Sequence, residues 1–283
     1  MRGGYGTAKA VPFRRRIEIC MQEQSHRDGS LSGQVAVVTG STRGIGAGIA
    51  KKFAEHGARV VVHGREREQG EKVVGAIRSA GGEASLVVGD LKDEGHCRSV
   101  IRHAVERFGQ LDVLVNNAGV VDRGNIENTS IELWDTILAV NLRAPFILCQ
   151  EAVQRMKERK SGCIVNIGSV NAYVGMRKLL PYSASKGGLM TFTKNLAHYL
   201  TEYRIRANQI NPGWVLTEGE HHVQSVGEGR GETWLEEASE TRPFGRLISP
   251  EEIARAALFF ATNELITGAV LDYEQVVIGA IPD

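Results

Sequence analysis

Short apolar runs alternate with longer amphipathic segments from Gln34 to about residue 210. Val35 to Val38 is wholly apolar and lies between glycines, which is typical of a strand buried on both faces of a parallel sheet. Similar runs lie at 59–63, 84–88, 111–115, 163–167 and 205–210. Between them, helical periodicity predicts helices from the glycine-rich turn at 39–46 to Gly57, then around 73–77, 100–108, 130–158 and 182–203. Pro145 can break the helix expected at 130–158.

This alternation predicts βαβ units, and right-handed crossovers then place helices on both faces of the sheet. The expected fold is α/β: a single Rossmann-type, doubly wound parallel sheet spanning residues 32–283. Residues 1–31 are expected to be a mobile N-terminal extension. The segment 216–245 is polar and acidic, has no strand period and interrupts the βα rhythm, so it is interpreted as a substrate lid.

Charge and cysteine content narrow the classes of function. The chain has 34 Lys and Arg against 33 Asp and Glu, so no general field attracts nucleic acid or an anionic membrane. No apolar run is expected to span a bilayer. The cysteines at 20, 97, 149 and 163 form no Cys-x-x-Cys pair and are interpreted as reduced thiols of a cytoplasmic protein. His221 and His222 have no third ligand at a suitable spacing, so no metal site is predicted.

A glycine-rich turn follows the first strand. Gly40, Gly44 and Gly46 have the spacing Gly-x-x-x-Gly-x-Gly and precede a predicted helix. Glycines there allow a tight turn and close approach of the backbone to a pyrophosphate, and the helix N-terminus presents unpaired N–H groups. A glycine cluster alone is more often a loop, but the strand–turn–helix context favours a dinucleotide site.

Tyr182 and Lys186 are four residues apart on a predicted helix, so their side chains face the same way. A free tyrosine has a pKa of about 10 and is a poor base near neutrality. A neighbouring ammonium favours the phenolate and is expected to lower that pKa. Taken alone, a Tyr-x-x-x-Lys pattern is more often a surface pair; behind a phosphate-binding turn it indicates general acid–base chemistry.

The order and spacing of six motifs resemble the short-chain dehydrogenase/reductase family over about residues 33–283. The motifs are Thr39 to Gly46, Asn116 to Gly119, Asn141, Ser169, Tyr182 with Lys186, and Asn211 to Gly213. Within that family, the chain resembles the sugar and polyol dehydrogenases and the 3-oxoacyl reductases.

The resemblance implies a role for each catalytic residue. Tyr182 would exchange a proton with the substrate oxygen, and Ser169 would hold that oxygen by a hydrogen bond. Lys186 would also bind the ribose hydroxyls, and Asn141 would anchor a water that passes protons to Lys186. The cofactor would lie against Gly40, Ser41, Thr42, Arg43, Gly44, Ile45, Gly46, Arg65, Asp90, Leu91, Asn117, Ala118, Gly119, Tyr182, Lys186, Pro212, Gly213, Val215 and Thr217.

The end of the second strand bears on the choice of cofactor. An NAD site normally has an acid there, and the family position, eighteen residues after Gly46, is Gly64. Arg65 follows it and Arg43 lies in the turn, so two guanidiniums could bind a 2′-phosphate. NADP(H) is therefore the expected cofactor, with NAD(H) possible. In the alternative interpretation, Arg43 and Arg65 are solvated surface charges with Glu66 or Glu68 nearby.

The sequence thus predicts an NADP-preferring enzyme that interconverts an alcohol and a carbonyl. The polar lid favours a small polar substrate such as a sugar or polyol. A 3-oxoacyl-thioester reductase and a non-catalytic NADP-sensing protein are the alternatives. By resemblance, the chain is expected to form a homotetramer or homodimer, with Gly187 and Gly188 allowing close approach of a partner helix.

Overall fold

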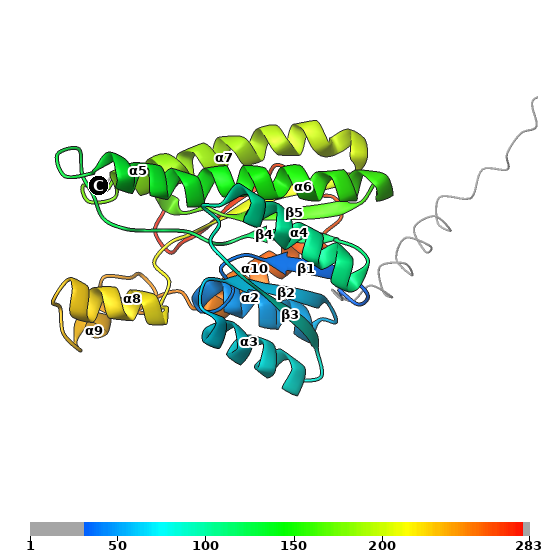
Figure 1. Ribbon diagram of the computed structural model, residues 1–283. Coiled ribbons are helices and arrows are strands. Elements are labelled where there is room, and N and C mark those ends of the chain that lie inside the picture. Colours follow the sequence, from blue (N-terminus) through cyan, green and yellow to red (C-terminus); the bar gives the residue numbers. More distant parts are fainter. Residues whose placement is uncertain (1–30, 280–283) are drawn as a thin grey trace, which may run out of the picture.

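The computed structural model describes residues 31–279, and its centre is a seven-stranded parallel sheet (Figure 1). The strands are β1 (Val35–Val38), β2 (Arg59–Gly64), β3 (Glu83–Val88), β4 (Val113–Asn116), β5 (Gly162–Ile167), β6 (Ile205–Pro212) and β7 (Val270–Tyr273). The helices are α2 (Gly44–Glu55), α3 (Arg67–Ser79), α4 (Glu94–Phe108), α5 (Ile131–Leu138), α6 (Ala144–Arg159), α7 (Leu180–Leu200), α8 (Glu218–His222), α9 (Trp234–Glu240) and α10 (Pro250–Thr262). The predicted Rossmann-type α/β fold is confirmed.

The strands lie in the order β3-β2-β1-β4-β5-β6-β7. Helices α2, α3 and α10 cover one face of the sheet, and α4, α6 and α7 cover the other (Figure 1). After β3 the chain returns to the middle of the sheet, so the connections on the two sides of the β1–β4 pair diverge. Such a switch point opens a crevice at the carboxyl ends of the strands, where open α/β sheets bind their ligands.

Each inner strand contributes side chains to two cores, as a sheet buried on both faces requires. In β1, Ala36 and Val38 pack against the α2–α10 side, whereas Val35 and Val37 pack against the α4–α6 side. All four are fully buried. This explains why the run is apolar throughout rather than alternating.

The expected break near Pro145 is a widening of the helix rather than an interruption. A π-helical turn, η1 (Ala139–Arg143), joins α5 to α6, and Pro145 lies in the first turn of α6. Proline has no N–H and its ring clashes with the carbonyl four residues earlier, so the preceding turn departs from α-helical geometry. The residue four positions before Pro145 is Asn141, which therefore lies in the π-helical turn.

The domain begins earlier than the boundary at residue 32. Leu31 is fully buried in the α2–α10 core, and its N–H donates to the carbonyl of His56 (2.7 Å). Leu31 therefore belongs to the domain and not to the extension. The rest of that extension, residues 1–30 with Cys20, lies outside the described residues.

One helical run is longer and more apolar than expected. Ile131–Arg159 has 29 residues and a mean hydropathy of 1.2 in its most apolar window, which by length and composition would suffice to cross a bilayer. Contrary to the sequence-based expectation, a segment therefore does reach that length. However, 67% of the window is buried inside the domain, as in the core helix of an α/β fold.

The three cysteines within the described residues are free and buried, as expected. Burial raises the pKa of Cys97 to about 11 and that of Cys149 to about 12. These thiols are protonated near neutrality and act as small apolar core residues.

Candidate active site

The glycine turn connects β1 to α2 at the switch point. Gly40 has a φ of +61°, and a Cβ there would lie 2.8 Å from the Cα of Ala118, so only glycine fits. Arg43 precedes α2 and its side chain caps no N–H group of the helix. The N-terminus of this 12-residue helix therefore presents its N–H groups toward the crevice, which is the arrangement that binds a phosphate.

The side chains of two residues assigned to the cofactor, Ser41 and Asn117, hold the turn. Asn117 Nδ2 donates to the carbonyls of Thr39 (2.9 Å) and Gly40 (3.0 Å). Ser41 Oγ donates to Val38 O (2.6 Å) and accepts from the His63 N–H (3.0 Å). Both polar groups are occupied by the protein, so these side chains shape the site rather than contact a ligand through those atoms.

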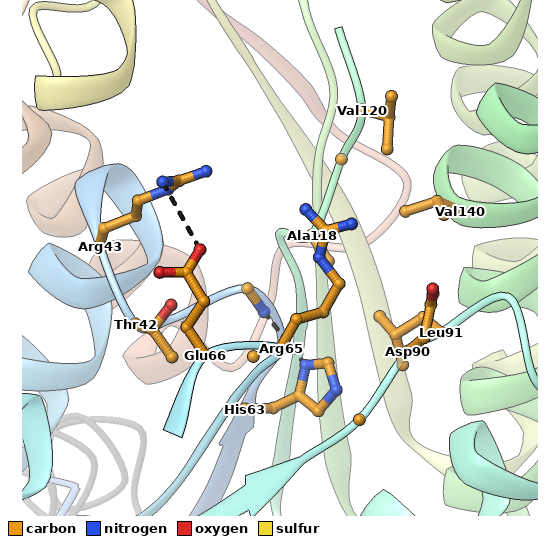
Figure 2. A pocket seen from close by; sticks show the side chains of 14 residues that line it. Thr42, Arg43, His63, Arg65, Glu66, Asp90, Leu91, Ala118, Val120 and Val140 are labelled. Atoms are coloured by element: carbon orange, nitrogen blue, oxygen red, sulfur yellow. Dashed lines mark hydrogen bonds and ion pairs between the residues drawn. The ribbon is translucent and has the colours of Figure 1, made fainter. Parts of the chain in front are cut away.

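A pocket beside the turn gathers most residues assigned to the adenosine end (Figure 2). It is lined by Gly40, Thr42, Arg43, His63, Gly64, Arg65, Glu66, Gly89, Asp90, Leu91, Ala118, Gly119, Val120 and Val140. Arg43 and Arg65 reach into it from different loops, as predicted, and Arg43 forms a 3.9 Å ion pair with Glu66 (Figure 2). Because both partners are mostly exposed, this ion pair is weak.

The second strand ends at Gly64, which has no side chain. A Cβ at this position would lie 2.4 Å from Thr42 Cγ2, so a larger residue there would require the Thr42 side chain to shift. The carboxylate that usually binds a ribose in NAD sites is absent at that position.

His63 lines the same pocket and pairs with a second histidine, His96. His63 Nδ1 accepts a long hydrogen bond from the Gly40 N–H (3.4 Å), and its Nε2 lies 3.2 Å from Nε2 of His96. Burial, with the nearby His96, lowers the pKa of His63 to about 4. His63 is therefore neutral near pH 7, as its role as a hydrogen-bond acceptor requires.

Ser169, Tyr182 and Lys186 come together at the carboxyl end of β5. Ser169 follows that strand and is buried, and Tyr182 lies in the first turn of α7. Lys186 is one helical turn later; its Nζ lies 5.6 Å from the centre of the Tyr182 ring and donates to Ile167 O (2.8 Å). The helix thus presents the phenol and the ammonium to the same space, as their four-residue spacing predicts.

The protonation of this pair differs from the sequence-based expectation. Burial raises the pKa of Tyr182; a hydrogen bond with the Ser169 side chain acts in the opposite direction, and the charge of Glu220 raises it further. Burial also lowers the pKa of Lys186 to about 8. In the chain by itself, desolvation therefore dominates, whereas the expected lowering of the Tyr182 pKa relied on Lys186 together with the positive nicotinamide ring of the oxidised complex.

Asn141 occupies the site but does not contact Lys186 directly. Its side chain is fully buried in the π-helical turn, where Oδ1 accepts from the Val120 N–H (2.8 Å) and Nδ2 donates to Val120 O (2.9 Å) and Ser185 Oγ (3.0 Å). It thereby joins the loop after β4 to α7, and its contact on α7 is Ser185, which lies between Tyr182 and Lys186 in the sequence.

The segment after β6 continues the site from the sheet toward the lid. Pro212 and Val215 are buried, Gly213 donates its N–H to Tyr273 O (2.9 Å), and Thr217 caps α8. Thr217 also lies against the glycine turn, since a Cβ at Gly44 would be 3.4 Å from Thr217 Cγ2. These residues therefore flank the cofactor crevice as the resemblance implies.

The segment interpreted as a lid, residues 216–245, is a small folded unit with its own core. Trp234 is fully buried and packs with Ala238, Leu247 and Trp214. Trp234 Nε1 donates to His221 Nδ1 (2.9 Å), which leaves that nitrogen unavailable to a metal. Most polar groups of this segment thus bind one another, so its composition as a whole says less about the substrate than the sequence suggested.

An ion-pair cluster attaches the lid to the loops that border the site. Glu228 lies 2.8 Å from Arg123 Nε, in the loop after β4, and 3.5 Å from Lys178 Nζ, just before α7. All three side chains are partly accessible, so each of these ion pairs contributes little stability.

Sequence reasoning missed three residues of this site. The charge of Glu220 raises the pKa of Tyr182, and His63 accepts a hydrogen bond from the Gly40 N–H in the glycine turn. Asn211 accepts a hydrogen bond from the Ser169 N–H (3.1 Å). Glu220 follows the capping Thr217 by three residues, which predicts a helix start but not a direction toward the site. Tertiary contacts alone assign these roles.

The geometry agrees with comparisons to known proteins. The family model described as short chain dehydrogenase matches residues 34–226. An uncharacterised oxidoreductase of Thermotoga maritima is 38% identical over 247 residues, covering 87% of this chain and 97% of the relative. A 3-oxoacyl-acyl-carrier-protein reductase of Chlamydia pneumoniae is 32% identical over 236 residues, covering 83% and 92%. A crystal structure of an actinorhodin polyketide ketoreductase variant with NADPH has a TM-score of 0.80 at 32% identity, covering 86% and 96%.

The fold and the site define an oxidoreductase with a nicotinamide dinucleotide as cofactor. The chain belongs to the short-chain dehydrogenase/reductase family. The residues present fit such a cofactor, because the Gly40 turn, the open N-terminus of α2 and the pocket beside Arg43 and Arg65 form a continuous cradle.

The buried lysine predicts a pH-dependent stability. In the folded chain the pKa of Lys186 is about 8, below its ordinary value of 10.5, so the unfolded chain binds more protons between these values. Stability therefore rises with pH through that window. The free energy of unfolding of the wild type, relative to that of Lys186→Met, should therefore increase by up to ~3 kcal/mol from below pH 8 to about pH 10.5.

Urea unfolding of the cofactor-free protein at each pH measures this difference. The exposed Lys51, changed to Met, is the control and should give a difference that does not vary with pH. A flat difference for Lys186→Met as well would show that Lys186 titrates as an exposed lysine does.

Proposed function

We propose that this enzyme interconverts an alcohol and a carbonyl on a small polar substrate, with NADP(H) as the preferred cofactor. The observation that carries the proposal is the convergence of Ser169, Tyr182 and Lys186 beside the dinucleotide crevice. A protein that only sensed NADP would have no need for a buried proton donor with an assisting serine and lysine.

The side chains divide the proton chemistry among them. In reduction, Tyr182 Oη donates its proton to the carbonyl oxygen, and in oxidation it accepts the alcohol proton. Ser169 Oγ donates a hydrogen bond to the same oxygen and stabilises its developing charge. Lys186 stabilises the phenolate that remains after donation. The cofactor, when bound, supplies or accepts the hydride at the substrate carbon.

Replacing the proton donor tests this assignment. Tyr182→Phe keeps the ring in place and removes the only atom that exchanges the proton, so kcat should fall by at least a hundredfold. NADPH affinity, measured by fluorescence titration, should change little. Wild-type turnover in Tyr182→Phe would refute the role given to this residue.

NADP preference is supported by the two arginines of the adenosine pocket and by the absence of an acid at Gly64. The ketoreductase structure that resembles this chain holds NADPH. Glu66 opposes this preference in part through its contact with Arg43, so Arg65 is the better candidate for a 2′-phosphate ligand.

Arg65→Ala should weaken NADPH binding about tenfold or more, because a hydrogen bond between two charged groups contributes roughly 1.5–3 kcal/mol. NADH binding should be unaffected, since NADH has no 2′-phosphate. Arg67→Ala, at an exposed arginine that starts α3 nearby, is the control. The preference itself is contradicted if the wild type has a higher kcat/KM with NADH than with NADPH.

Glu220 supports a substrate that carries hydroxyl groups. Its Oε1 accepts from Trp214 Nε1 and from Gln224 Nε2, both at 2.7 Å, so two lid residues hold the carboxylate. The charge of the same carboxylate raises the pKa of Tyr182, so Glu220 lies near enough to the reacting end of the site to act on it. A carboxylate there accepts hydrogen bonds from substrate hydroxyls and repels substrate anions.

Glu220→Gln should therefore lower kcat/KM about tenfold for polyols and hydroxyketones, and little for a simple ketone of similar size. The panel should pair NADPH with ketones, keto-sugars and acyl thioesters, and NADP⁺ with sugars and polyols. Glu218→Gln, exposed on the same short helix, is the matched control. Equal losses on hydroxylated and plain substrates would contradict the proposed substrate class.

A 3-oxoacyl-thioester reductase is the second candidate, because the Chlamydia pneumoniae relative carries that name. The same panel separates the two candidate functions, since an acyl thioester would then be the best substrate.

We also propose a cytoplasmic location and a homotetramer or homodimer. Support for assembly is the groove lined by Leu138, Leu142, Phe146 and Phe192 on α5 to α7. Gly188 itself packs against Leu142 of the same chain, so it serves contacts within the subunit.

A further inference from the structure

A row of buried polar side chains crosses the carboxyl half of the sheet. Asn116 on β4 donates to Asn166 on β5 (2.8 Å), and Asn166 donates to Thr193 on α7 (2.8 Å). Thr193 Oγ1 lies 2.9 Å from Gln209 Oε1 on β6, and Gln209 Nε2 donates to Asn211 Oδ1 (2.7 Å). Each of the five side chains is at most 3% exposed, so the row is shielded from water.

Asn211 ends the row at the catalytic serine. Its Oδ1 accepts from the backbone N–H of Ser169 at 3.1 Å as well as from Gln209. A Cβ at Gly168 would lie 2.1 Å from this oxygen, so the chain before Ser169 passes directly over the Asn211 amide. The position of Ser169 therefore depends on where the amide oxygen points.

Asp272 determines that direction. Asn211 Nδ2 donates to Asp272 Oδ1 at 2.9 Å, and Asp272 lies on the neighbouring strand β7, in register with Asn211. If the amide turned over, its NH₂ group would face two N–H donors and its oxygen would face a carboxylate. Only the observed orientation of the Asn211 amide satisfies its three partners, which are the Ser169 N–H, Gln209 Nε2 and the Asp272 carboxylate.

Tyr173 lies on the exposed side of this pair. Its hydroxyl interacts with both Asp272 and Asn211, and the residue is 46% exposed. Burial and the charge of Asp272 raise the pKa of Tyr173, so the hydroxyl stays protonated near pH 7 and donates to the carboxylate.

We infer that Asn211, oriented by Asp272, is a positioning residue that holds Ser169 in its catalytic place. The inference rests on the proposed function, because it assigns Ser169 to the substrate oxygen. Reacting groups displaced by about 1 Å can lose about a hundredfold in rate. Loss of the Asn211 amide should therefore lower kcat about ten- to a hundredfold without weakening NADPH binding.

Asn208 provides a matched control on the same strand. It is also fully buried, and its amide binds Ile266 O (2.9 Å) and the Ala269 N–H (3.0 Å), but it does not contact Ser169. Asn208→Ala should lower the melting temperature about as much as Asn211→Ala and leave kcat near that of the wild type. Equal kcat in the two variants would overturn the inference.

A double variant tests whether the effect passes through Ser169. In a Ser169→Ala background, Asn211→Ala should reduce kcat by no more than about twofold, because the group that it positions is already absent. A full additional loss would mean that Asn211 acts elsewhere, and would overturn the inference.

The exposed Asp272 offers variants that are less prone to misfold. Asp272→Asn keeps an oxygen acceptor for Asn211 Nδ2 and should retain most of kcat, whereas Asp272→Ala should behave like Asn211→Ala. Equal activity of the two Asp272 variants would contradict the orienting role.

Crystal structures of Asn211→Ala and Asn208→Ala separate this inference from the proposed function, since they need no turnover. Ser169 should be displaced in the first only; Ser169 in its original place in both would overturn the inference. If the wild type reduced no carbonyl while Ser169 moved as expected, the proposed reaction would fail and the positioning role would stand.

Discussion

The need to satisfy amides buried within the sheet controls the geometry of this site. A buried amide without a partner costs about 1–3 kcal/mol, so the polar side chains at the ends of β4, β5 and β6 must bind one another. The row from Asn116 to Asn211 does this for all of its amide groups except Asn116 Oδ1, which is buried without a partner, and the row ends at the backbone of Ser169. A group that depends on so many mutually satisfied bonds can adopt few alternative positions, as catalysis requires.

Burial then sets the protonation of the catalytic pair. Desolvation lowers the pKa of Lys186 and raises that of Tyr182, so burial shifts each group toward its neutral form in the chain by itself. A tyrosine kept protonated still carries the proton that it is proposed to donate. The fold that keeps the phenol protonated is the same one that places it beside the dinucleotide crevice.

The lid shows how composition can mislead. Its acids, histidines and tryptophans suggest a surface that binds polar substrates, yet Trp234 and His221 bind each other, and Glu228 binds Arg123 and Lys178. Glu220 differs because two lid donors hold its carboxylate on the side of Tyr182. The specificity of the site therefore depends on the direction of a few side chains rather than on the polarity of the segment.

The sequence by itself determined the order of the elements and the sheet type, and it predicted the serine, tyrosine and lysine that the fold brings together, because periodicity and motif spacing are local properties of the chain. It also located the glycine turn and the missing acid at Gly64. Only the tertiary structure decided that Leu31 belongs to the core, that the Ser41 and Asn117 side chains are occupied by the turn, and that burial raises the pKa of Tyr182. These outcomes depend on contacts between residues far apart in the chain, and on how much water remains around each group, which no local pattern encodes.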